Sequence, residues 1–416
     1  MTQAERVQFR SAHSAHTDWT VAVEECLLLL AQHAGDERFT RSPNLGFIYL
    51  TDALAAHAEQ ILTLLKARTG IPNWVGAVGA GICAGTVEYT DEPAMAVMLA
   101  QFAPGSFNVF SGTQRPPALG TRTEGGAEVA FTALVHADPD TPDLPDLVVD
   151  MAHKVASGYL FGGIASGRST HQIADRVLRG GLSGVVFASD VALVSRVSQG
   201  VHPLPGAARH TVTQANANFV IALDGRPAFD VLLEDAGIRP RSSSTGAEGV
   251  PREDFTRVRT QLQALGRRGL FVGIEPQEEG YRERAGALRH DYMVRPVVAI
   301  DPTKGVVAIG APAEEGQMLT FCSRDESAAR KDLMRVCSEL RSHLADAAEA
   351  GEPAVARGAV YVSCVGRGSH LFGEPHEELR LIQHQLGNVP LVGFYANGEI
   401  GGRNLYGFTG VLTVFY

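Results

Sequence analysis

The hydrophobic positions of the chain predict a recurring unit of strand, helix, strand and glycine-rich turn. Residues 45–50 are rich in β-branched and aromatic side chains, and residues 55–68 place apolar side chains at helical spacing. Pro72 begins a second apolar strand that runs into a glycine-rich turn, and residues 94–102 predict a further buried strand.

The end of the chain repeats this unit most clearly. Residues 359–364 predict a strand, and residues 375–386 predict a helix that begins with proline and acidic side chains. Residues 389–395 and 409–416 predict the two strands that follow. A weaker copy is expected within residues 128–167.

The glycine-rich turns of these copies share one spacing. Gly76, Gly81 and Gly85 of the first copy match Gly393, Gly398 and Gly402 of the last, and the step from Gly162 to Gly167 matches more weakly. Glycine at fixed positions between apolar strands indicates tight turns and close approach of the backbone. The repeat therefore predicts pseudo-symmetry between the halves of the chain.

The chemistry of the two clearer turns differs. The first turn is almost wholly apolar, whereas the last carries Tyr395, Asn397 and Glu399, and Ile82 stands in the first copy where Glu399 stands in the last. If one copy holds a site, the last copy is the better candidate.

The length of 416 residues predicts two domains. We place the boundary near 205–215 and expect domains at 10–210 and 211–416, with the polar stretch 239–254 as a mobile loop. The expected class is α/β (α+β): mixed sheets covered by helices. Purely parallel sheets are disfavoured because the strands follow each glycine turn too closely for helical crossovers.

Composition and charge exclude several classes of function. The net charge of −10 and the lack of a basic run disfavour nucleic-acid binding. The five cysteines show no CxxC spacing, and the histidines show no HxH or HExxH spacing, so neither a disulfide framework nor a metal site is expected. Without a signal peptide or a membrane-spanning apolar run, the protein is expected in the cytoplasm and away from membranes.

The first glycine turn does not predict a nucleotide cofactor. A dinucleotide-binding turn opens a helix whose N-terminal N–H groups meet the pyrophosphate. Here the β-branched and aromatic residues 86–89 follow Gly85, so we expect a turn between strands and no cofactor.

A candidate binding loop follows the strand that ends at Cys364. Gly366, Arg367 and Gly368 make a turn rich in backbone N–H groups, which suits a carboxylate or phosphate. The same residues also fit a structural turn in which Arg367 pairs with a nearby glutamate.

The turn at Asn397 and Glu399 follows the neighbouring strand. If the two strands are adjacent, these side chains converge with Cys364 and Arg367 at one end of one sheet. An arginine and a glutamate there could bind the two charges of a zwitterion, or they could form a structural ion pair. Arg295, at the entrance of another apolar strand, is a further candidate for the site.

Cys364 also permits a catalytic interpretation. A thiol at the end of a strand is placed as a nucleophile can be, but catalysis requires a base, and His370 is near only in sequence. A buried small apolar residue is the alternative.

With these segments the sequence resembles the FIST proteins, which pair N- and C-terminal FIST domains and occur in bacterial sensory proteins and in eukaryotic F-box proteins. The resemblance rests on residues 292–296, 364–368 and 393–401, with Thr409 near the end, and more loosely on 75–85 and 162–165. It implies sensing of a small ligand such as an amino acid. Where the family has polar residues in the first turn, this chain has Ala80 and Ile82, which weakens the case for a site there.

The leading hypothesis is thus a small-ligand-binding sensory protein that acts through a separate output partner, because no output module accompanies the two domains. Its ligand-binding residues are expected to be Arg295, Cys364, Gly366, Arg367, Gly368, Tyr395, Asn397 and Glu399. The alternatives are an interaction scaffold without a ligand and an enzyme that uses Cys364 as its nucleophile.

Overall fold

The computed structural model divides the chain into two compact units. The described residues are 8–32, 42–112, 120–123, 126–238, 252–275, 293–351 and 355–416. Unit 1 comprises Met1–Ser198 and Leu333–Tyr416, and unit 2 comprises Gln199–Asp332. The expected α/β class with mixed sheets in two domains is confirmed. The compact units differ from the segments 10–210 and 211–416, because unit 2 is inserted into unit 1.

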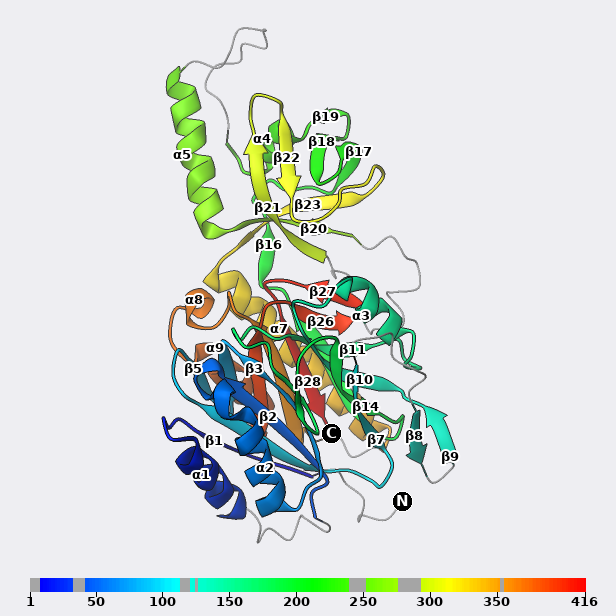
Figure 1. Ribbon diagram of the computed structural model, residues 1–416. Coiled ribbons are helices and arrows are strands. Elements are labelled where there is room, and N and C mark those ends of the chain that lie inside the picture. The colour runs from blue at the N-terminus through cyan, green and yellow to red at the C-terminus, as the bar shows by residue number, and fades with distance from the viewer. Residues whose placement is uncertain are drawn as a thin grey trace. The chain divides into compact units, whose positions relative to one another are not determined.

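Unit 1, whose helices and strands are drawn in Figure 1, contains three six-stranded sheets. The strands of the three sheets follow equivalent orders. Sheet 1 consists of β1 (Gln8–Ser14), β6 (Met95–Gln101), β2 (Leu45–Thr51), β3 (Asn73–Gly79), β12 (Gln172–Ala174) and β13 (Val177–Leu178). Sheet 2 consists of β7 (Phe107–Gly112), β14 (Leu182–Phe187), β10 (Thr132–Ala137), β11 (Leu160–Ile164), β26 (Glu399–Gly402) and β27 (Asn404–Tyr406). Sheet 3 consists of β15 (Leu193–Ser198), β28 (Gly410–Phe415), β24 (Gly358–Cys364), β25 (Leu391–Ala396), β4 (Gly81–Ala84) and β5 (Val87–Thr90).

A parallel pair of strands lies at the centre of each sheet. The pairs are β2–β3, β10–β11 and β24–β25, and the other described pairings within these sheets are antiparallel. Helices connect the strands of each pair, because two parallel neighbours need a crossover connection. The connecting helices are η1 (Asp52–His57) with α2 (Ala58–Thr69), α3 (Leu144–Ala152), and α8 (Ser369–Phe372) with α9 (Glu377–Leu386).

The second strand of each pair continues, past its turn, into the next sheet. β3 leads to β4, which pairs with β25; β25 leads to β26, which pairs with β11; and β11 leads to β12, which pairs with β3. The exchange closes after three steps, so unit 1 is a cyclic arrangement of three repeats. The repeated unit expected from the sequence is present, but it relates three sheets of unit 1 and not the two halves of the chain.

A glycine occupies the same place in the parallel pair of every repeat. Gly76, Gly162 and Gly393 are paired with Ile48, Val135 and Tyr361 respectively. A Cβ at these glycines would lie 1.7, 1.9 and 1.7 Å from the carbonyl oxygen of the paired residue. No other residue type fits there, because real Cβ atoms never approach a carbonyl oxygen so closely.

The far end of each exchanged strand also has one backbone conformation. Gly85, Asp175 and Gly402 lie directly after the paired part of β4 and β12 and at the end of β26, with φ of +57°, +59° and +63°. The spacing of Gly76, Gly81 and Gly85 therefore matches Gly393, Gly398 and Gly402 in three dimensions. Gly167 does not correspond to Gly81, because the turn of the second repeat is longer and β12 begins only at Gln172.

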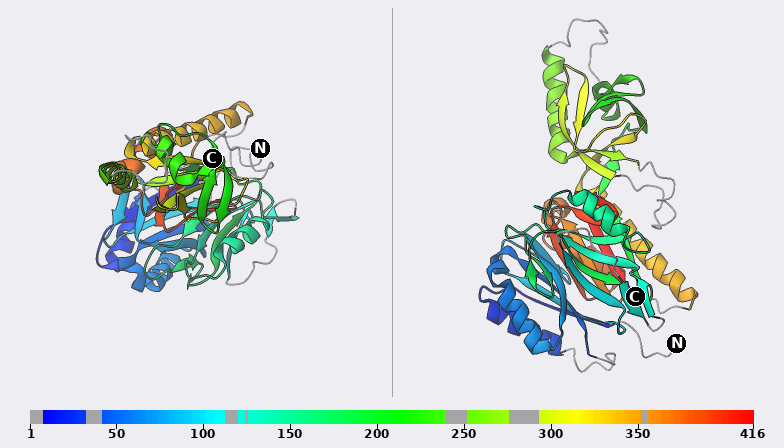
Figure 2. Two further views of the ribbon diagram at one scale, coloured as in Figure 1. Left: turned by 90° about the horizontal axis from the view of Figure 1, so that it is seen from above. Right: turned by 45° about the vertical axis from the view of Figure 1, so that its right-hand side comes forward.

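The three sheets enclose one aromatic core, and helices cover their outer faces (Figures 1 and 2). The ring centroid of Phe415 lies 5.0 to 6.4 Å from those of five other phenylalanines of this core. α1 (Trp19–Gln32) and α2 pack on the outer side of sheet 1, and α3 packs on sheet 2. The described centre of unit 1 is thus filled by its own side chains.

Unit 2 is a closed barrel with helices attached. Its ring of paired strands is β17 (His210–Asn216), β18 (Phe219–Leu223), β22 (Val306–Ile309), β21 (Met293–Asp301), β20 (Leu270–Ile274) and β23 (Met318–Arg324), with β16 (Val201–Pro203) on β23 and β19 (Arg226–Pro227) on β18. The described part of unit 2 also contains the helices α4 (Ala228–Asp235) and α5 (Arg252–Arg268). Of the loop expected at 239–254, residues 239–251 lie outside the described residues, and the rest begins α5. The chain returns to unit 1 through α7 (Glu326–Glu349).

We expect Gly393→Ala to destabilise unit 1 by about 3 kcal/mol or more, because the added Cβ overlaps the carbonyl of Tyr361. Gly407→Ala is the matched control, since a Cβ at Gly407 meets no atom within 4 Å. Urea unfolding of both variants measures the difference. Equal midpoints would show that the parallel pair can separate without cost.

Candidate functional site

The strand ends of sheet 3 meet as the sequence predicts. β24 and β25 are parallel neighbours, with Cys364 paired to Ala396, and the N–H of Val365 donates to the carbonyl of Ala396. The loop that begins at Val365 and the turn at Asn397 therefore start side by side. Cys364 is also joined to the start of β28, because its N–H donates to the carbonyl of Thr409.

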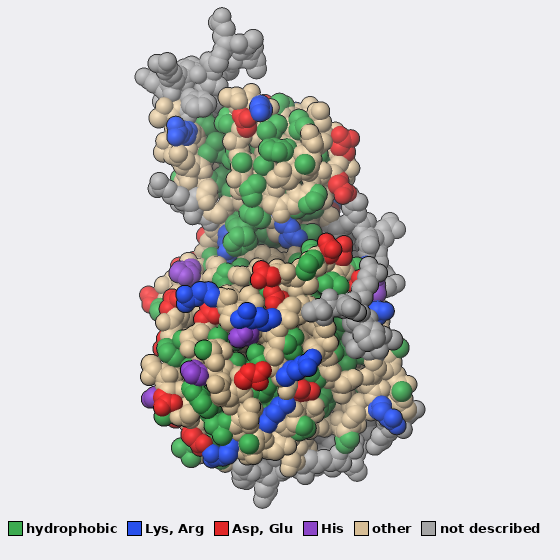
Figure 3. Space-filling view, in the orientation of Figure 1, with side chains coloured by type: hydrophobic (Ala, Val, Ile, Leu, Met, Phe, Trp, Pro, Cys, Tyr) green, Lys and Arg blue, Asp and Glu red, His purple; other side chains and the backbone are tan. Residues whose placement is uncertain are grey.

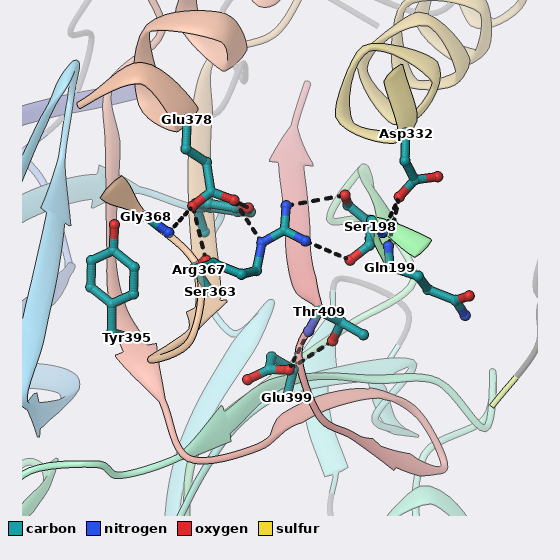
Figure 4. Close-up of polar contacts among 12 residues, drawn as sticks. Ser198, Gln199, Asp332, Ser363, Arg367, Gly368, Glu378, Tyr395, Glu399 and Thr409 are labelled. Atoms are coloured by element: carbon teal, nitrogen blue, oxygen red, sulfur yellow. Dashed lines mark hydrogen bonds and ion pairs between the residues drawn. The ribbon is translucent and has the colours of Figure 1, made fainter. Parts of the chain in front are cut away.

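Arg367 is buried in the loop after β24, where it forms an ion pair (Figure 4). Its side chain is among the largest that are fully buried, and its Nε lies 2.7 Å from Oε1 of Glu378. The two terminal nitrogens donate to Ser198, one to the carbonyl at 3.3 Å and one to Oγ at 3.2 Å. Of the two interpretations of Arg367, the structure supports the pairing with a nearby glutamate.

Glu378 is the acceptor that organises this loop. Besides Arg367, it accepts hydrogen bonds from the Tyr361 hydroxyl at 2.5 Å, the Ser363 hydroxyl at 3.2 Å and the N–H of Gly368 at 3.1 Å. Gly368 takes φ of +60°, a conformation that favours glycine. Burial, offset in part by the Arg367 charge, holds the pKa of Tyr361 well above its usual range.

Glu399 is fully buried at the start of β26, and its carboxyl group is only partly satisfied. Its Oε2 accepts from the N–H of Thr409 at 3.0 Å and from its hydroxyl at 2.8 Å. Its Oε1 is buried without an oxygen or nitrogen donor among the described residues. The thiol of Cys364 is the neighbouring weak donor. The Arg367 charge also acts on this carboxyl group. Cys364, Arg367 and Glu399 therefore lie near one another, as the sequence led us to expect.

Burial raises the pKa of Glu399 to about 8, although Thr409, the Arg367 charge and Cys364 each lower it. Burial therefore favours the protonated form of this carboxyl group well above the usual pKa of a glutamate. A carboxyl group with this pKa can release its proton within the physiological range when a cation approaches.

The cyclic repeat gives Glu399 two equivalents. Ile82, Gln172 and Glu399 are paired with the corresponding residues Phe394, Ala77 and Gly163 of their neighbouring sheets. All three side chains are fully buried. Gln172 is hydrogen bonded to Ser183 and Gly181, as an amide can be at such a position. Only the third repeat places an ionisable group there.

The remaining predicted site residues lie around this cluster or apart from it. Tyr395 donates to Glu88 on β5, and a Cβ at Gly368 would lie 2.8 Å from the Tyr395 hydroxyl. Gly366 is partly exposed, and the exposed Asn397 donates its backbone N–H to Ile164. Arg295 belongs to β21 of unit 2, where its guanidinium donates to the carbonyl of Val294. Its participation in the strand-end site stays a prediction.

Cys364 is 6% exposed, and His370 is exposed to solvent on α8. Within the described ranges, no group of three or more His, Cys, Asp or Glu side chains is arranged to hold a metal ion. None of the helices described for this chain is both long and apolar enough to cross a membrane.

Comparison with known proteins places the chain. Residues 44–226 match the model of the FIST N domain, and residues 247–402 match that of the FIST C domain. An uncharacterized protein of Mycobacterium tuberculosis is 31% identical over 396 residues, covering 92% of this chain and 94% of the relative. The chain belongs to the FIST family. An uncharacterized protein of Mycobacterium bovis is 29% identical over 395 residues, with the same coverage.

FIST domains are associated with small-ligand sensing in signal transduction and not with catalysis. The FIST C match includes both strand ends of the cluster, from Cys364 through Glu399, and so places Arg367 and Glu378 in one domain of the family. Thr409 lies beyond the matched residues.

Sequence reasoning missed two residues that bind the Arg367 side chain in this FIST protein, Glu378 and Ser198. Acidic residues are favourable at a helix N-terminus, and this role alone accounts for the acidic residues at the start of α9 in the sequence. The sequence therefore offered no reason to expect that Glu378 also pairs with Arg367. Ser198 is distant in sequence and carries no motif. The signal that remained was Arg367 itself, because an arginine between two glycines requires an acceptor if it is buried.

We expect Glu378→Leu to cost about 3–5 kcal/mol of stability, because it leaves the Arg367 guanidinium buried without its partner. The double variant Arg367→Met with Glu378→Leu should recover only the part of that loss caused by the unpaired guanidinium, because Tyr361, Ser363 and Gly368 lose their acceptor in both variants. The exposed pair of Arg68 and Glu24 is the control, and Glu24→Leu should cost at most about 1 kcal/mol. Urea unfolding compares them, and a double variant as unstable as the single one would contradict the ion pair.

The raised pKa of Glu399 predicts a pH dependence with a definite sign. The folded chain keeps a proton that the unfolded chain loses above its usual pKa of 4.5, so stability falls as the pH rises from about 4.5 to 8. The slope approaches about 1.4 kcal/mol per pH unit. Glu399→Gln should remove this component, and the exposed Glu374→Gln should keep it. Unfolding curves across this pH range that do not differ between wild type and Glu399→Gln would refute the assignment.

Proposed function

We propose that this FIST protein senses a small metabolite with an ammonium group, such as an amino acid, at the strand ends of sheet 3. The observation that carries the proposal is the buried carboxyl group of Glu399, whose Oε1 has no oxygen or nitrogen donor among the described residues. Buried polar groups are normally satisfied, and this exception requires an explanation; in the proposal, a donor from the ligand reaches Oε1 once the carboxyl group has lost its proton.

The charge of the surroundings supports a cationic group. Glu88, Glu378 and Glu399 are all buried near these strand ends, at 7%, 0% and 0% exposure, whereas Arg367 is the one buried cation that the described residues place there. One of these negative charges is neutralised by the proton on Glu399. A ligand ammonium can take the place of that proton, with its attraction strengthened by the low dielectric of the site.

The loop of Gly366, Arg367 and Gly368 has the role of a cover in this proposal. Its arginine is held by Glu378 and Ser198, so the guanidinium fixes the loop and lowers the pKa of Glu399 across the site. Val365, at 40% exposure, and Asn397 mark the side that faces solvent. A ligand that enters from this side has to displace the loop, and that displacement gives a partner a difference to recognise.

We further propose that a separate signalling protein in the cytoplasm reads the bound state. The family's association with signal transduction supports a partner.

A thermal-shift screen of amino acids, amines and central metabolites against the intact chain tests the proposal. Stabilisation follows the ratio of ligand concentration to Kd. We expect a ligand with an ammonium group to raise the Tm, and Glu399→Gln to abolish the rise while the exposed Glu374→Gln preserves it. Hits that stabilise Glu399→Gln equally would exclude this site. The absence of any hit would favour a scaffold, and selective alkylation of Cys364 would favour an enzyme.

Because the ammonium group replaces a proton, affinity for the hit should rise as the pH approaches 8, by nearly tenfold per pH unit. Calorimetry in two buffers of different ionisation enthalpy should detect about one proton released per ligand bound. An affinity independent of pH below 8 would contradict the exchange.

A further inference from the structure

Unit 2 contains an apolar pocket that the strand-end site does not involve. The pocket has a volume of about 580 Å³, within the range of roughly 300–1,000 Å³ typical of small-molecule sites. α4 supplies Phe229 and Leu233, α5 supplies Val258 and Leu262, and β21 supplies Val297 to Ile300.

The floor of this pocket is a β-bulge. β21 pairs with β22 through Val297 and Ile309 and then through Ala299 and Ala308, so Val298 is an extra residue without a partner in the ladder. Val298 is 56% exposed, although it is a large apolar side chain in a strand. Bulges redirect side chains and occur often next to binding sites. Here the bulge presents consecutive apolar residues to the pocket.

The wall formed by α5 leaves the space open. Gly266 lines the pocket, and a Cβ at this position would meet no atom within 4 Å. Glycine inside a helix costs about 1 kcal/mol relative to alanine. At Gly266 the missing side chain keeps open a volume that an ordinary helix residue would fill.

The polar side chains of α5 at the pocket are Arg259 and Gln263, one helical turn apart. Neither has a hydrogen-bond or ion-pair partner among the described residues. Arg259 is exposed, so its charge lies at the mouth of the pocket while the floor and the remaining walls are apolar. Figure 3 shows hydrophobic side chains on the visible face of unit 2 with few charged groups among them.

We propose that this pocket binds a small amphipathic molecule whose apolar part lies on the bulge of β21 and whose anionic head group meets Arg259. The guanidinium recognises a carboxylate, phosphate or sulfate through two parallel hydrogen bonds, and Gln263 adds a donor beside it. The site is independent of Glu399, and it gives unit 2 a ligand of different chemical class from that of unit 1.

Calorimetry with three probes of equal chain length tests the proposal on the intact protein: dodecanoate, dodecanol and dodecyltrimethylammonium, each below its micelle concentration. Wild type should bind dodecanoate most tightly and dodecyltrimethylammonium least. Arg259→Met should weaken dodecanoate about tenfold and leave dodecanol unchanged, and Arg259→Lys should retain only part of the affinity, because an ammonium group cannot form the two parallel hydrogen bonds. Equal affinity for the anionic and cationic probes, or no binding of any probe, would overturn the proposal.

Gly266→Leu separates binding from folding. The new side chain fills the pocket and should abolish binding of dodecanoate, while its better helix propensity keeps or raises the Tm. Ala264→Leu, also exposed on α5 but outside the lining, is the matched control and should bind normally. Unchanged binding by Gly266→Leu would exclude the pocket. A wild-type dimer in sedimentation that Gly266→Leu dissociates would replace the small molecule with a second copy and also overturn the proposal.

The same probes distinguish the two sites. Glu399→Gln should leave dodecanoate binding unchanged, and Gly266→Leu should leave the response to the ammonium ligand unchanged. Loss of dodecanoate binding in Glu399→Gln would show that the amphiphile occupies the strand-end site, and it would refute the pocket in unit 2.

Discussion

Unit 1 depends on the contact between a glycine Cα and the carbonyl of the neighbouring parallel strand. Because a Cβ added to this glycine would lie less than 2 Å from that carbonyl oxygen, the strand can lie there only without a side chain. The strand then continues past its turn into the next sheet. Because Gly76, Gly162 and Gly393 each permit this close pairing, the three exchanges add up to a closed ring, and no repeat can be removed without exposing the edges of its neighbours.

Such a ring makes the repeats interchangeable in backbone and free to differ in side chains. The three equivalent positions in the exchanged strands hold Ile82, Gln172 and Glu399, and all three side chains are buried. The first is apolar, the second is polar but uncharged, and the third is ionisable. The third repeat adds a second difference. Arg367 requires Glu378, and that pair fixes the loop that covers the strand ends. Asymmetry on a symmetric frame is therefore the feature that points to function.

The sequence predicted the parts of this arrangement that depend on local pattern. The strands around 45–50 and 359–364, the helices between them and the matched spacing of Gly76 and Gly393 follow from hydrophobic period and from the steric freedom of glycine. The sequence comparison of Glu399 with Ile82 was also right, because the two residues occupy equivalent paired positions in their sheets. The exchange between sheets was not predictable, since it pairs strands that are far apart in the sequence. The ion pair of Arg367 with Glu378 was missed for a different reason: helix-start chemistry explains Glu378 equally well.

Unit 2 is inserted between two segments of unit 1. It follows β15 and ends at Asp332 within α7, in the part of the repeat where the described residues of the first repeat place α1 between β1 and β2. The insertion therefore belongs to the third repeat, which also carries Arg367 and Glu399. Ser198, the last residue of unit 1 before the insertion, is held by both terminal nitrogens of Arg367. A proposed ligand that moves the Arg367 loop would therefore also alter the contacts of Ser198, the last residue of unit 1 before the inserted segment.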